Sequence, residues 1–365
     1  TAPYEQAHGW VGGKGGAFPH YAFHGYYTLD WTCMDQNMGT IEEFRAFVNK
    51  CHERGIRVVM DVVMNHVGYN NTADMVEYNH GYTEHSVDWI GMTDGKWDAN
   101  DTVKWDPSYW DTTWFGPWIS SFGFDRGEGY GGSCGGLPDV KTELTSSVGL
   151  PPVLVTKWNK ELGKTDVVGQ GNTTGNKYVD YQLPSVANVD WNGKTGNWRT
   201  DQNVAPADYQ VMWLSAWVRE FGIDGFRCDT AKHVETWRWG QLKVACQAAL
   251  EAWRNDPSKE DTAGAKDWDE NFWMTGECFG WTSTAGSGDY YTTGGFDSMI
   301  NFSFNGASGN KGRCPTSSDW SSYININRNG DSDGNGNRNS VLSYVSSHDT
   351  GLHRSSGATK LGTML

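Results

Sequence analysis

The sequence lacks any run of 18 apolar residues, so it offers no candidate for a transmembrane helix. No secretory signal peptide is visible in the first 30 residues, which are rich in glycine, histidine and tyrosine. Basic residues are few, because 29 Lys and Arg stand against 44 Asp and Glu, for a formal net charge of −15. Nucleic-acid backbones and anionic membranes bind Lys/Arg patches, so this composition argues against both as partners.

Cysteine is present seven times but never as C-x-x-C, so a zinc cluster is not expected. The cysteines leave disulfide pairing open, and their odd number leaves at least one thiol unpaired within the chain. Tryptophan, by contrast, is abundant, with 20 residues. Tryptophan rings stack on the apolar face of sugars, but they also fill large cores, and composition does not decide between these interpretations.

A length of 365 residues is typical of two domains, or of one large α/β domain with an insertion. Residues 40–54 read as an amphipathic helix in which Thr40 and Glu43 have the spacing of a capping box. Residues 56–64, "IRVVMDVVM", follow as an apolar run typical of a buried parallel strand. A helix followed by such a strand indicates an α/β fold.

The same alternation resumes late in the chain, with helices expected at 208–221 and 236–254 and strands at 223–229, 272–277 and 341–346. A long stretch rich in glycine, asparagine, aspartate and tryptophan lies between the two halves, and we expect it to be an inserted domain. The predicted division is a first part of the α/β domain at 1–66, the insertion at 67–205, and the remainder of the α/β domain at 206–365.

Polar side chains follow four of the apolar strands, where each strand ends. They are Asn65 with His66, Arg227 with Asp229, Glu277, and His348 with Asp349. A (β/α)₈ TIM barrel collects functional residues at the carboxyl ends of several strands. A doubly wound sheet usually has a glycine-rich phosphate loop after a strand, and none is present. The pattern therefore predicts a TIM barrel with its site at this end.

Three carboxylates of this set suit glycoside hydrolysis, which needs a nucleophile or base and a proton donor. Arg227 lies two residues before Asp229 and so shares a strand face with it, which should lower the pKa of Asp229 and keep it ionised. Glu277 has apolar neighbours, which should raise its pKa and suit a general acid. Taken singly, each group is more often structural, and it is the four strand ends together that favour a catalytic site.

These residues carry a resemblance to the alpha-amylase family, glycoside hydrolase family 13. The segments "DVVMNH" (61–66), "GFRCDTAKH" (225–233), "TGECFG" (275–280) and "VSSHDT" (345–350) resemble the four signature regions of the family, in family order. "LPDV" (137–140) is similar to its short additional motif, and "AFHGYYTLD" (22–30) to the segment that places an aromatic ring beside the cleaved bond. The sequence as a whole is most similar to those of periplasmic or secreted bacterial alpha-amylases.

The resemblance implies endo-acting, retaining cleavage of alpha-1,4-glucosidic bonds in starch, glycogen or maltooligosaccharides, with an alpha-glucan as the partner. Asp229 would be the nucleophile, Glu277 the acid and base, and Asp349 the group that binds sugar hydroxyls and stabilises the transition state. The substrate-binding residues it implies are Arg227, His66, His348, Tyr26, His24, Lys232 and His233.

The resemblance also implies a structural Ca²⁺ between the barrel and the insertion. Asn65, Asp139 and the backbone carbonyl of His233 match that site, and all are the oxygen ligands that calcium prefers. Asp125 and Glu128 are open candidates for a further ligand.

We expect a barrel that is incomplete at both ends, because the sequence begins after the position of the family's first barrel strand and ends shortly after the seventh. Cys228 and Cys278 lie beside the expected nucleophile and acid, and Cys228 is interpreted as a small core residue. A transglycosylase or alpha-glucosidase, a non-catalytic sugar-binding relative, and a metal-dependent phosphohydrolase suggested by His348-Asp349 are the alternatives. The expected protein is a monomer in an extracellular or periplasmic location.

Overall fold

The structure is a computed structural model in which 15 segments of the chain are described. They are residues 2–7, 9–11, 18–20, 24–68, 89–93, 96–103, 114–121, 138–161, 180–187, 189–191, 194–260, 264–279, 288–302, 340–344 and 347–349. No described helix is long and apolar enough to cross a membrane. Cys134, Asp125 and Glu128 lie outside the described residues.

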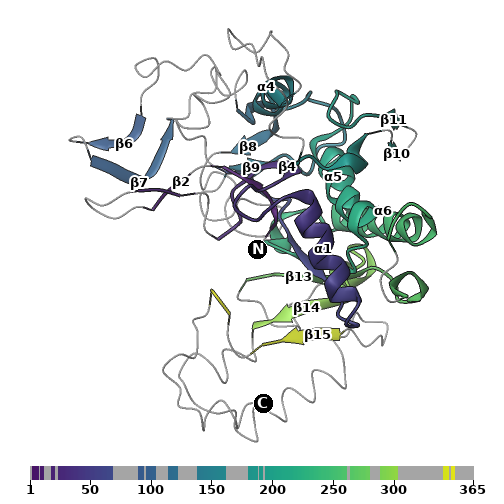
Figure 1. The fold of residues 1–365 in the computed structure, drawn as a ribbon. Helices are drawn as coiled ribbons and strands as arrows, with labels where there is room; N and C mark the ends of the chain where they lie inside the picture. The colour runs from purple at the N-terminus through teal and green to yellow at the C-terminus, as the bar shows by residue number, and fades with distance from the viewer. Residues whose placement is uncertain are drawn as a thin grey trace, which may run out of the picture.

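Helices and short 3₁₀ turns alternate with strands along the chain (Figure 1). The α-helices are α1 (Ile41–His52), α4 (Pro152–Glu161), α5 (Pro206–Phe221), α6 (Thr236–Asn255) and α7 (Gly288–Thr292). The 3₁₀ helices are η1 (Gly116–Trp118), η3 (Pro184–Val186), η4 (Ala231–His233) and η5 (Ala265–Asp267).

The central sheet has five parallel strands in the order β15-β14-β13-β12-β5. They are β5 (Val59–Val62), β12 (Gly225–Cys228), β13 (Trp273–Gly276), β14 (Ser298–Asn301) and β15 (Ser340–Ser343). Helix α6 joins β12 to β13, and α7 lies between β13 and β14, as parallel pairing requires. The predicted α/β class is confirmed, and in the described part of the chain the sheet is an open arc of the predicted barrel.

The remaining strands form two-stranded antiparallel pairs outside this sheet. The pairs are β1 (Tyr4–Gln6) with β4 (Thr28–Met34), β2 (Gly9–Val11) with β3 (Phe18–His20), β6 (Trp89–Thr93) with β7 (Lys96–Val103), β8 (Ile119–Ser121) with β9 (Asp139–Val140), and β10 (Val189–Trp191) with β11 (Lys194–Gly196). Strand β14 was not predicted, because "SMIN" is short and lacks a strong apolar pattern.

Local sequence signals explain where the helices begin and end. The Thr40 side chain accepts a hydrogen bond from the Glu43 N–H, and the Glu43 carboxylate accepts from the Thr40 N–H, so the predicted capping box is present at α1. Helix α5 ends at Gly222, whose φ of 71° is left-handed. A Cβ there would lie 2.5 Å from Trp253, so close packing as well as backbone conformation requires glycine.

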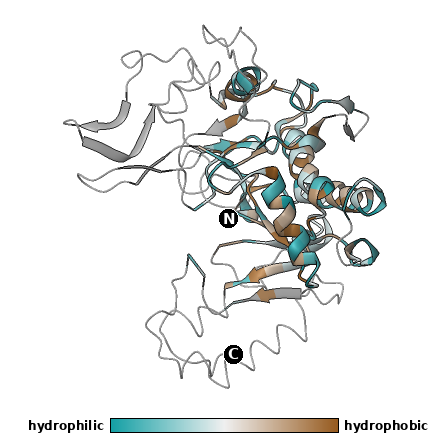
Figure 2. Ribbon diagram, in the orientation of Figure 1, coloured by the Kyte–Doolittle hydropathy of each residue, from teal (hydrophilic) through white to brown (hydrophobic). Residues whose placement is uncertain are grey.

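Buried tryptophans make much of the core between α5 and the N-terminal strands. Trp213 stacks on Trp31 and on Trp118, with ring centroids 5.7 and 5.6 Å apart. The Trp217 indole donates to the Trp31 carbonyl, so these rings also satisfy buried backbone groups. For these residues the core interpretation of the tryptophans is correct. Figure 2 shows the matching hydropathy, with a hydrophobic β14 and mixed character along α1.

Candidate active site

The site lies where β5, β12 and β13 end, and its centre is a guanidinium. Arg227 Nη1 lies 2.6 Å from Asp229 Oδ1 and 3.0 Å from Asp61 Oδ1, and Arg227 Nη2 lies 2.9 Å from Glu277 Oε1. All of these side chains are largely buried, with Arg227 the most exposed at 16%. One cation thus holds three carboxyl groups, which come from the ends of three neighbouring strands.

Glu277 and Asp229 interact directly, through a side-chain hydrogen bond. Burial, followed by the charge of Asp229, raises the pKa of Glu277 to about 8, so Glu277 keeps its proton at neutral pH and donates it. Glu277 Oε2 also accepts from the Thr230 N–H, at 3.1 Å. The predicted environment of a general acid is therefore present.

Arg227 lowers the pKa of Asp229, as expected, but the net shift of that pKa is opposite to the expected one. Burial raises the pKa of Asp229, and the opposing attraction of Arg227 does not offset it. The sequence placed Arg227 beside Asp229 correctly. It did not show how deeply the pair is buried, or that Arg227 also pairs with Asp61 and Glu277. Shared among three acids, a single guanidinium stabilises each of them less.

Thr230, directly after Asp229, has a left-handed backbone with φ of 48°, which a β-branched residue rarely adopts. This turn aims the Thr230 N–H at Glu277, and it starts η4, which carries Lys232 and His233. Lys232 is half-buried on the side of Cys278, where its charge opposes the burial that raises the pKa of that thiol to about 12.

Tyr26, the aromatic residue expected beside the cleaved bond, contacts Asp61 and two histidines. The Tyr26 hydroxyl donates to Asp61 Oδ2 at 2.7 Å, and the Tyr26 ring stacks between His24 and His348, with centroids 5.7 and 5.8 Å away. His348 Nε2 lies 3.2 Å from Asp349 Oδ2, and both side chains are accessible, at 58% and 33% exposure. The structure thus brings Tyr26, His24 and His348 together, and Asp349 joins this group through His348.

His66 is buried below the same tyrosine. Its Nε2 lies 3.0 Å from the Tyr26 carbonyl, and burial lowers the pKa of His66 to about 4, so the ring is neutral. A neutral imidazole that accepts no proton from solvent suits a hydrogen-bonding role better than acid–base work.

The residues expected at a calcium site also converge. The Asn65 side-chain amide faces Asp139 Oδ1 at 3.1 Å and the His233 carbonyl oxygen at 3.3 Å. With the amide nitrogen turned toward them, Asn65 donates two hydrogen bonds; with its oxygen turned toward them, three oxygens meet and require a cation. Oxygen ligands at this separation fit the coordination shell of Ca²⁺.

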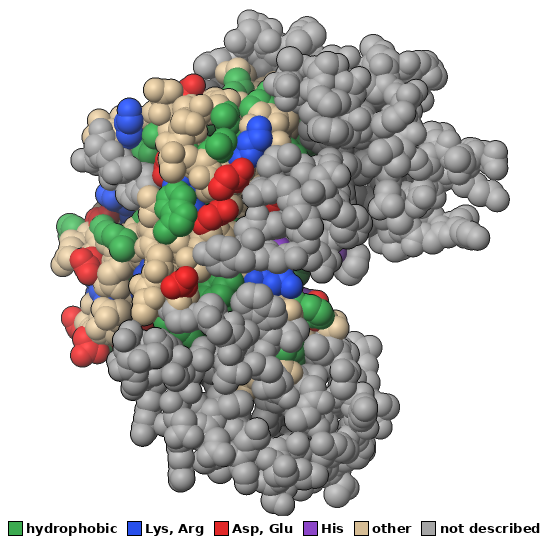
Figure 3. All heavy atoms as spheres, turned by 180° about the vertical axis from the view of Figure 1, so that it is seen from behind, with side chains coloured by type: hydrophobic (Ala, Val, Ile, Leu, Met, Phe, Trp, Pro, Cys, Tyr) green, Lys and Arg blue, Asp and Glu red, His purple; other side chains and the backbone are tan. Residues whose placement is uncertain are grey.

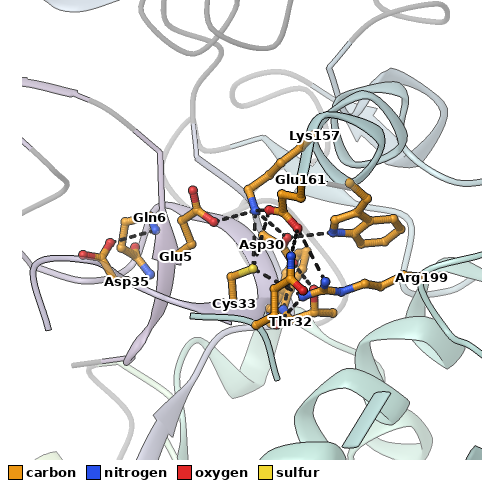
Figure 4. Close-up of polar contacts among 12 residues, drawn as sticks. Glu5, Gln6, Asp30, Thr32, Cys33, Asp35, Lys157, Glu161 and Arg199 are labelled. Carbon is orange, nitrogen blue, oxygen red and sulfur yellow. Dashed lines mark hydrogen bonds and ion pairs between the residues drawn. The ribbon is translucent and has the colours of Figure 1, made fainter. Parts of the chain in front are cut away.

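A second acidic cluster, shown in Figure 4, has a protein cation at its centre. Glu5, Asp30, Cys33 and Glu161 present ligand atoms within 4.8 Å of one another. The Lys157 ammonium lies 2.7 Å from Glu5 and 2.9 Å from Asp30, and it pairs with Glu161. Because Lys157 is completely buried and supplies the positive charge, this cluster reads as an ionic core that ties α4 to β1 and β4.

Sequence reasoning missed two residues at the site. Asp61 was quoted within "DVVMNH" but given no role, because its place beside Arg227 depends on the pairing of β5 with β12. Phe279 lies two residues after Glu277, is 52% exposed, and meets Phe302 edge-on at 5.2 Å. An exposed ring beside the acid was not predicted. The five cysteines in the described segments are free thiols; Cys228 is buried, as expected, and so is Cys278.

Comparison with known sequences agrees with this geometry. The family described as Alpha amylase, catalytic domain, matches residues 17–120. The periplasmic alpha-amylase of Escherichia coli K12 is 38% identical over 379 residues, which cover 98% of this chain and 48% of that protein. The alpha-amylase of Streptomyces lividans is 27% identical over 286 residues, covering 78% of this chain and 26% of that protein.

The predicted resemblance to alpha-amylases of glycoside hydrolase family 13 is thereby confirmed. The chain is similar over nearly its whole length to the E. coli enzyme, and it spans 48% of the length of that relative. Among solved structures, an Anoxybacillus alpha-amylase matches with 16% identity and a TM-score of 0.39 over 84% of this chain and 40% of that one. A Nostoc punctiforme debranching enzyme matches with 15% identity and a TM-score of 0.41 over 95% and 53%.

Proposed function

We propose that this chain carries the catalytic site of an endo-acting alpha-amylase that hydrolyses alpha-1,4-glucosidic bonds with retention of configuration. The observation that carries the proposal is the hydrogen bond between Asp229 and Glu277 on a shared Arg227. Retaining glycosidases have their two carboxyl groups about 5–5.5 Å apart, and inverting ones about 6.5–9.5 Å, to admit a water. Two carboxyl groups that pair with the two terminal nitrogens of one guanidinium, at 2.6 and 2.9 Å, lie close together, which supports the retaining arrangement.

The chemistry follows from the protonation of the pair. Glu277, protonated at neutral pH, gives its proton to the glycosidic oxygen as the bond to the anomeric carbon breaks. Asp229 attacks that carbon and forms a glycosyl ester, with Arg227 stabilising its carboxylate. Glu277, now ionised, takes a proton from water, and the resulting hydroxide displaces Asp229 and releases the sugar. The cycle returns both groups to their starting states.

The surrounding side chains would bind the sugar in this mechanism. Tyr26 would stack on the sugar ring that is attacked, with His24 and His348 beside it. His66 would hydrogen-bond the same ring as a neutral imidazole, and Asp349 would accept from its hydroxyls. Lys232 and the His233 side chain would contact the leaving portion of the chain, which favours an amylase over an alpha-glucosidase.

A structural calcium is part of the proposal. Asn65, Asp139 and the His233 carbonyl would hold it, and its charge would brace the turn after β12 against β9. The ion takes no part in the bond-breaking steps. The domain division at 67 and 205, a monomeric state, and an extracellular or periplasmic location complete the proposal; the location is supported by the periplasmic E. coli relative.

The test is a proton NMR time course on maltoheptaose in the presence of calcium. New reducing ends that first appear as the α-anomer, spread over several chain lengths, support a retaining endo-amylase. Initial β-anomeric ends would contradict the roles of Asp229 and Glu277. Products longer than the substrate would favour the transglycosylase, release of glucose alone would favour an alpha-glucosidase, and binding without cleavage would favour the non-catalytic relative.

A further inference from the structure

Arg238 is a buried arginine that joins helix α6 to the segment after β9. Its side chain is 2% exposed, and its guanidinium carbon lies 3.9 Å from the centroid of the Trp237 ring. Arg238 Nε donates to the Thr142 carbonyl at 3.0 Å, and Nη2 donates to the Leu144 carbonyl. A single side chain on α6 thus holds two backbone carbonyls of the segment that follows β9.

The remaining terminal nitrogen of Arg238 fixes the orientation of the guanidinium. Nη1 donates to Asp208 Oδ1 at 2.8 Å and to Gln241 Oε1 at 2.7 Å. Asp208 Oδ2 in turn accepts from the Ala205 N–H at the start of α5. The planar fork of an arginine can satisfy such partners together, which the single ammonium of a lysine cannot do. The two carbonyls are therefore held by a group that is itself anchored on α5 and α6.

A second contact joins the same two segments. The Thr142 hydroxyl donates to Glu235 Oε2 at 2.7 Å. Glu235 directly precedes α6 and lies two residues after His233, and Thr142 lies three residues after Asp139. Arg238 and Glu235 therefore both connect the chain just after His233 to the chain just after Asp139.

These two segments carry the ligands of the proposed calcium site. Asn65 and Asp139 are already fixed relative to each other, because the Val140 N–H donates to the Asn65 carbonyl at 2.8 Å and His66 forms an antiparallel bridge with Asp139. The third ligand, the His233 carbonyl, comes from η4, on a different part of the chain. Its place beside the other two ligands therefore depends on contacts that join the two segments.

We propose that Arg238 is a positioning residue for the calcium site, which holds the His233 carbonyl in place beside the other two ligands before the ion binds. Glu235 assists it through Thr142. This role rests on the structural calcium of the function proposed above. Ligands that are held in place lose less conformational freedom when the ion arrives, so the ion binds more tightly. Arg238 has only donors and does not ligate the ion itself.

The experiment measures the dissociation constant of Ca²⁺ by isothermal titration calorimetry on calcium-free wild type, Arg238→Lys and the control Arg219→Lys. Arg219 is an exposed arginine on α5. Arg238→Lys keeps the positive charge but loses the fork that reaches Thr142 and Leu144 together. We expect it to weaken calcium binding about 10- to 100-fold, the usual effect of removing a residue that orients a metal ligand. Arg219→Lys should bind calcium as wild type does.

A purely structural Arg238 would give a different result. The melting temperature of Arg238→Lys in EDTA would fall, but its calcium dissociation constant, measured well below that temperature, would equal that of wild type; this outcome overturns the proposal. A wild type that binds no calcium would refute the proposed ion and this role with it. Hydrolysis of maltoheptaose by wild type tests the catalytic proposal separately, so the failures are distinguishable.

Thr142→Val tests the positioning role even if Arg238→Lys does not fold. It removes the hydroxyl that donates to Glu235 and keeps the shape of the side chain. We expect calcium to bind about 2- to 10-fold more weakly, since one hydrogen bond contributes about this factor. Glu235→Gln keeps an acceptor for the hydroxyl and should bind calcium nearly as wild type does. Wild-type affinity in Thr142→Val would overturn the proposal, because both contacts join the same two segments.

Discussion

Asp229 and Glu277 share a hydrogen bond and are both held by the guanidinium of Arg227. In this arrangement the proton of the pair resides on Glu277, because burial and the charge of Asp229 raise its pKa. This unequal protonation suits the proposed roles of Asp229 as nucleophile and Glu277 as proton donor, since retaining glycoside hydrolysis requires that division.

Asp229→Asn and Glu277→Gln should each lower kcat by at least about 10³-fold while leaving the melting temperature close to that of wild type, since removal of a reacting group costs on this scale. Azide should distinguish the two roles. With an α-glycosyl fluoride as the activated substrate, azide should restore turnover of Asp229→Asn. The product should be a β-glycosyl azide, because azide attacks the anomeric carbon directly. Formation of an α-glycosyl azide by this variant would contradict Asp229 as the nucleophile.

The basic limb of the pH profile should follow Glu277. Its raised pKa of about 8 keeps the proton donor loaded through neutral pH, and kcat/KM should fall as the pH rises through about 8. The measurement is kcat/KM on maltoheptaose between about pH 4 and 10. If activity already falls at the ordinary pKa of a glutamate, Glu277 is not the proton donor in this environment.

Calcium should stabilise the protein through Asn65. A ligand present at 100 times its dissociation constant adds about 2.7 kcal/mol to the free energy of unfolding. The melting temperature should therefore be higher in calcium than in EDTA. Asn65→Ala should remove most of this difference, whereas the exposed Asn255→Ala should retain it. A calcium-dependent shift that is unchanged in Asn65→Ala would place the ion elsewhere.

Lys157→Met should destabilise the fold by about 3–5 kcal/mol, because it leaves Glu5, Asp30 and Glu161 buried without their common cation. Urea unfolding followed by tryptophan fluorescence would measure this. Lys194→Met, at an exposed lysine in β11, is the matched control and should change stability little. Equal stabilities of the two variants would show that the cluster is not an ionic core.

Glu5 should make stability depend on pH. Burial raises the pKa of Glu5 from 4.5 to about 8, although Lys157 opposes the shift. The folded state therefore holds this proton more tightly than the unfolded state does, and the resulting stabilisation is full below about pH 4.5 and is lost as the pH rises through about 8. In Glu5→Gln, the free energy of unfolding should depend less on pH over this range. A slope identical to wild type would show that Glu5 is not protonated in the fold.

Surface charge offers a further contrast with the interior. On the described part of the face in Figure 3, acidic and basic side chains lie intermixed with apolar and neutral ones. Inside, by comparison, two compact groups of charges surround Arg227 and Lys157. Substitutions at these two cations should therefore have far larger effects than substitutions of most surface charges.

The sequence by itself determined the local elements and the chemistry at their ends. The capping box fixed the start of α1, and the apolar runs before Asn65, Asp229 and Glu277 predicted parallel strands whose ends meet. The signature segments also indicated the family. These inferences succeed because they depend on periodicity and on residue type, which are properties of short segments.

Only the tertiary structure decided how the charges are shared. Asp61 lies beside Arg227 because β5 and β12 pair in one particular register, and no short segment contains that information. Likewise, the net upward pKa shift of Asp229 depends on burial by residues distant in sequence, and this outweighs the Arg227 contact that the sequence did reveal. Desolvation and partner number are collective properties of packing, so they could not be read from the motif alone.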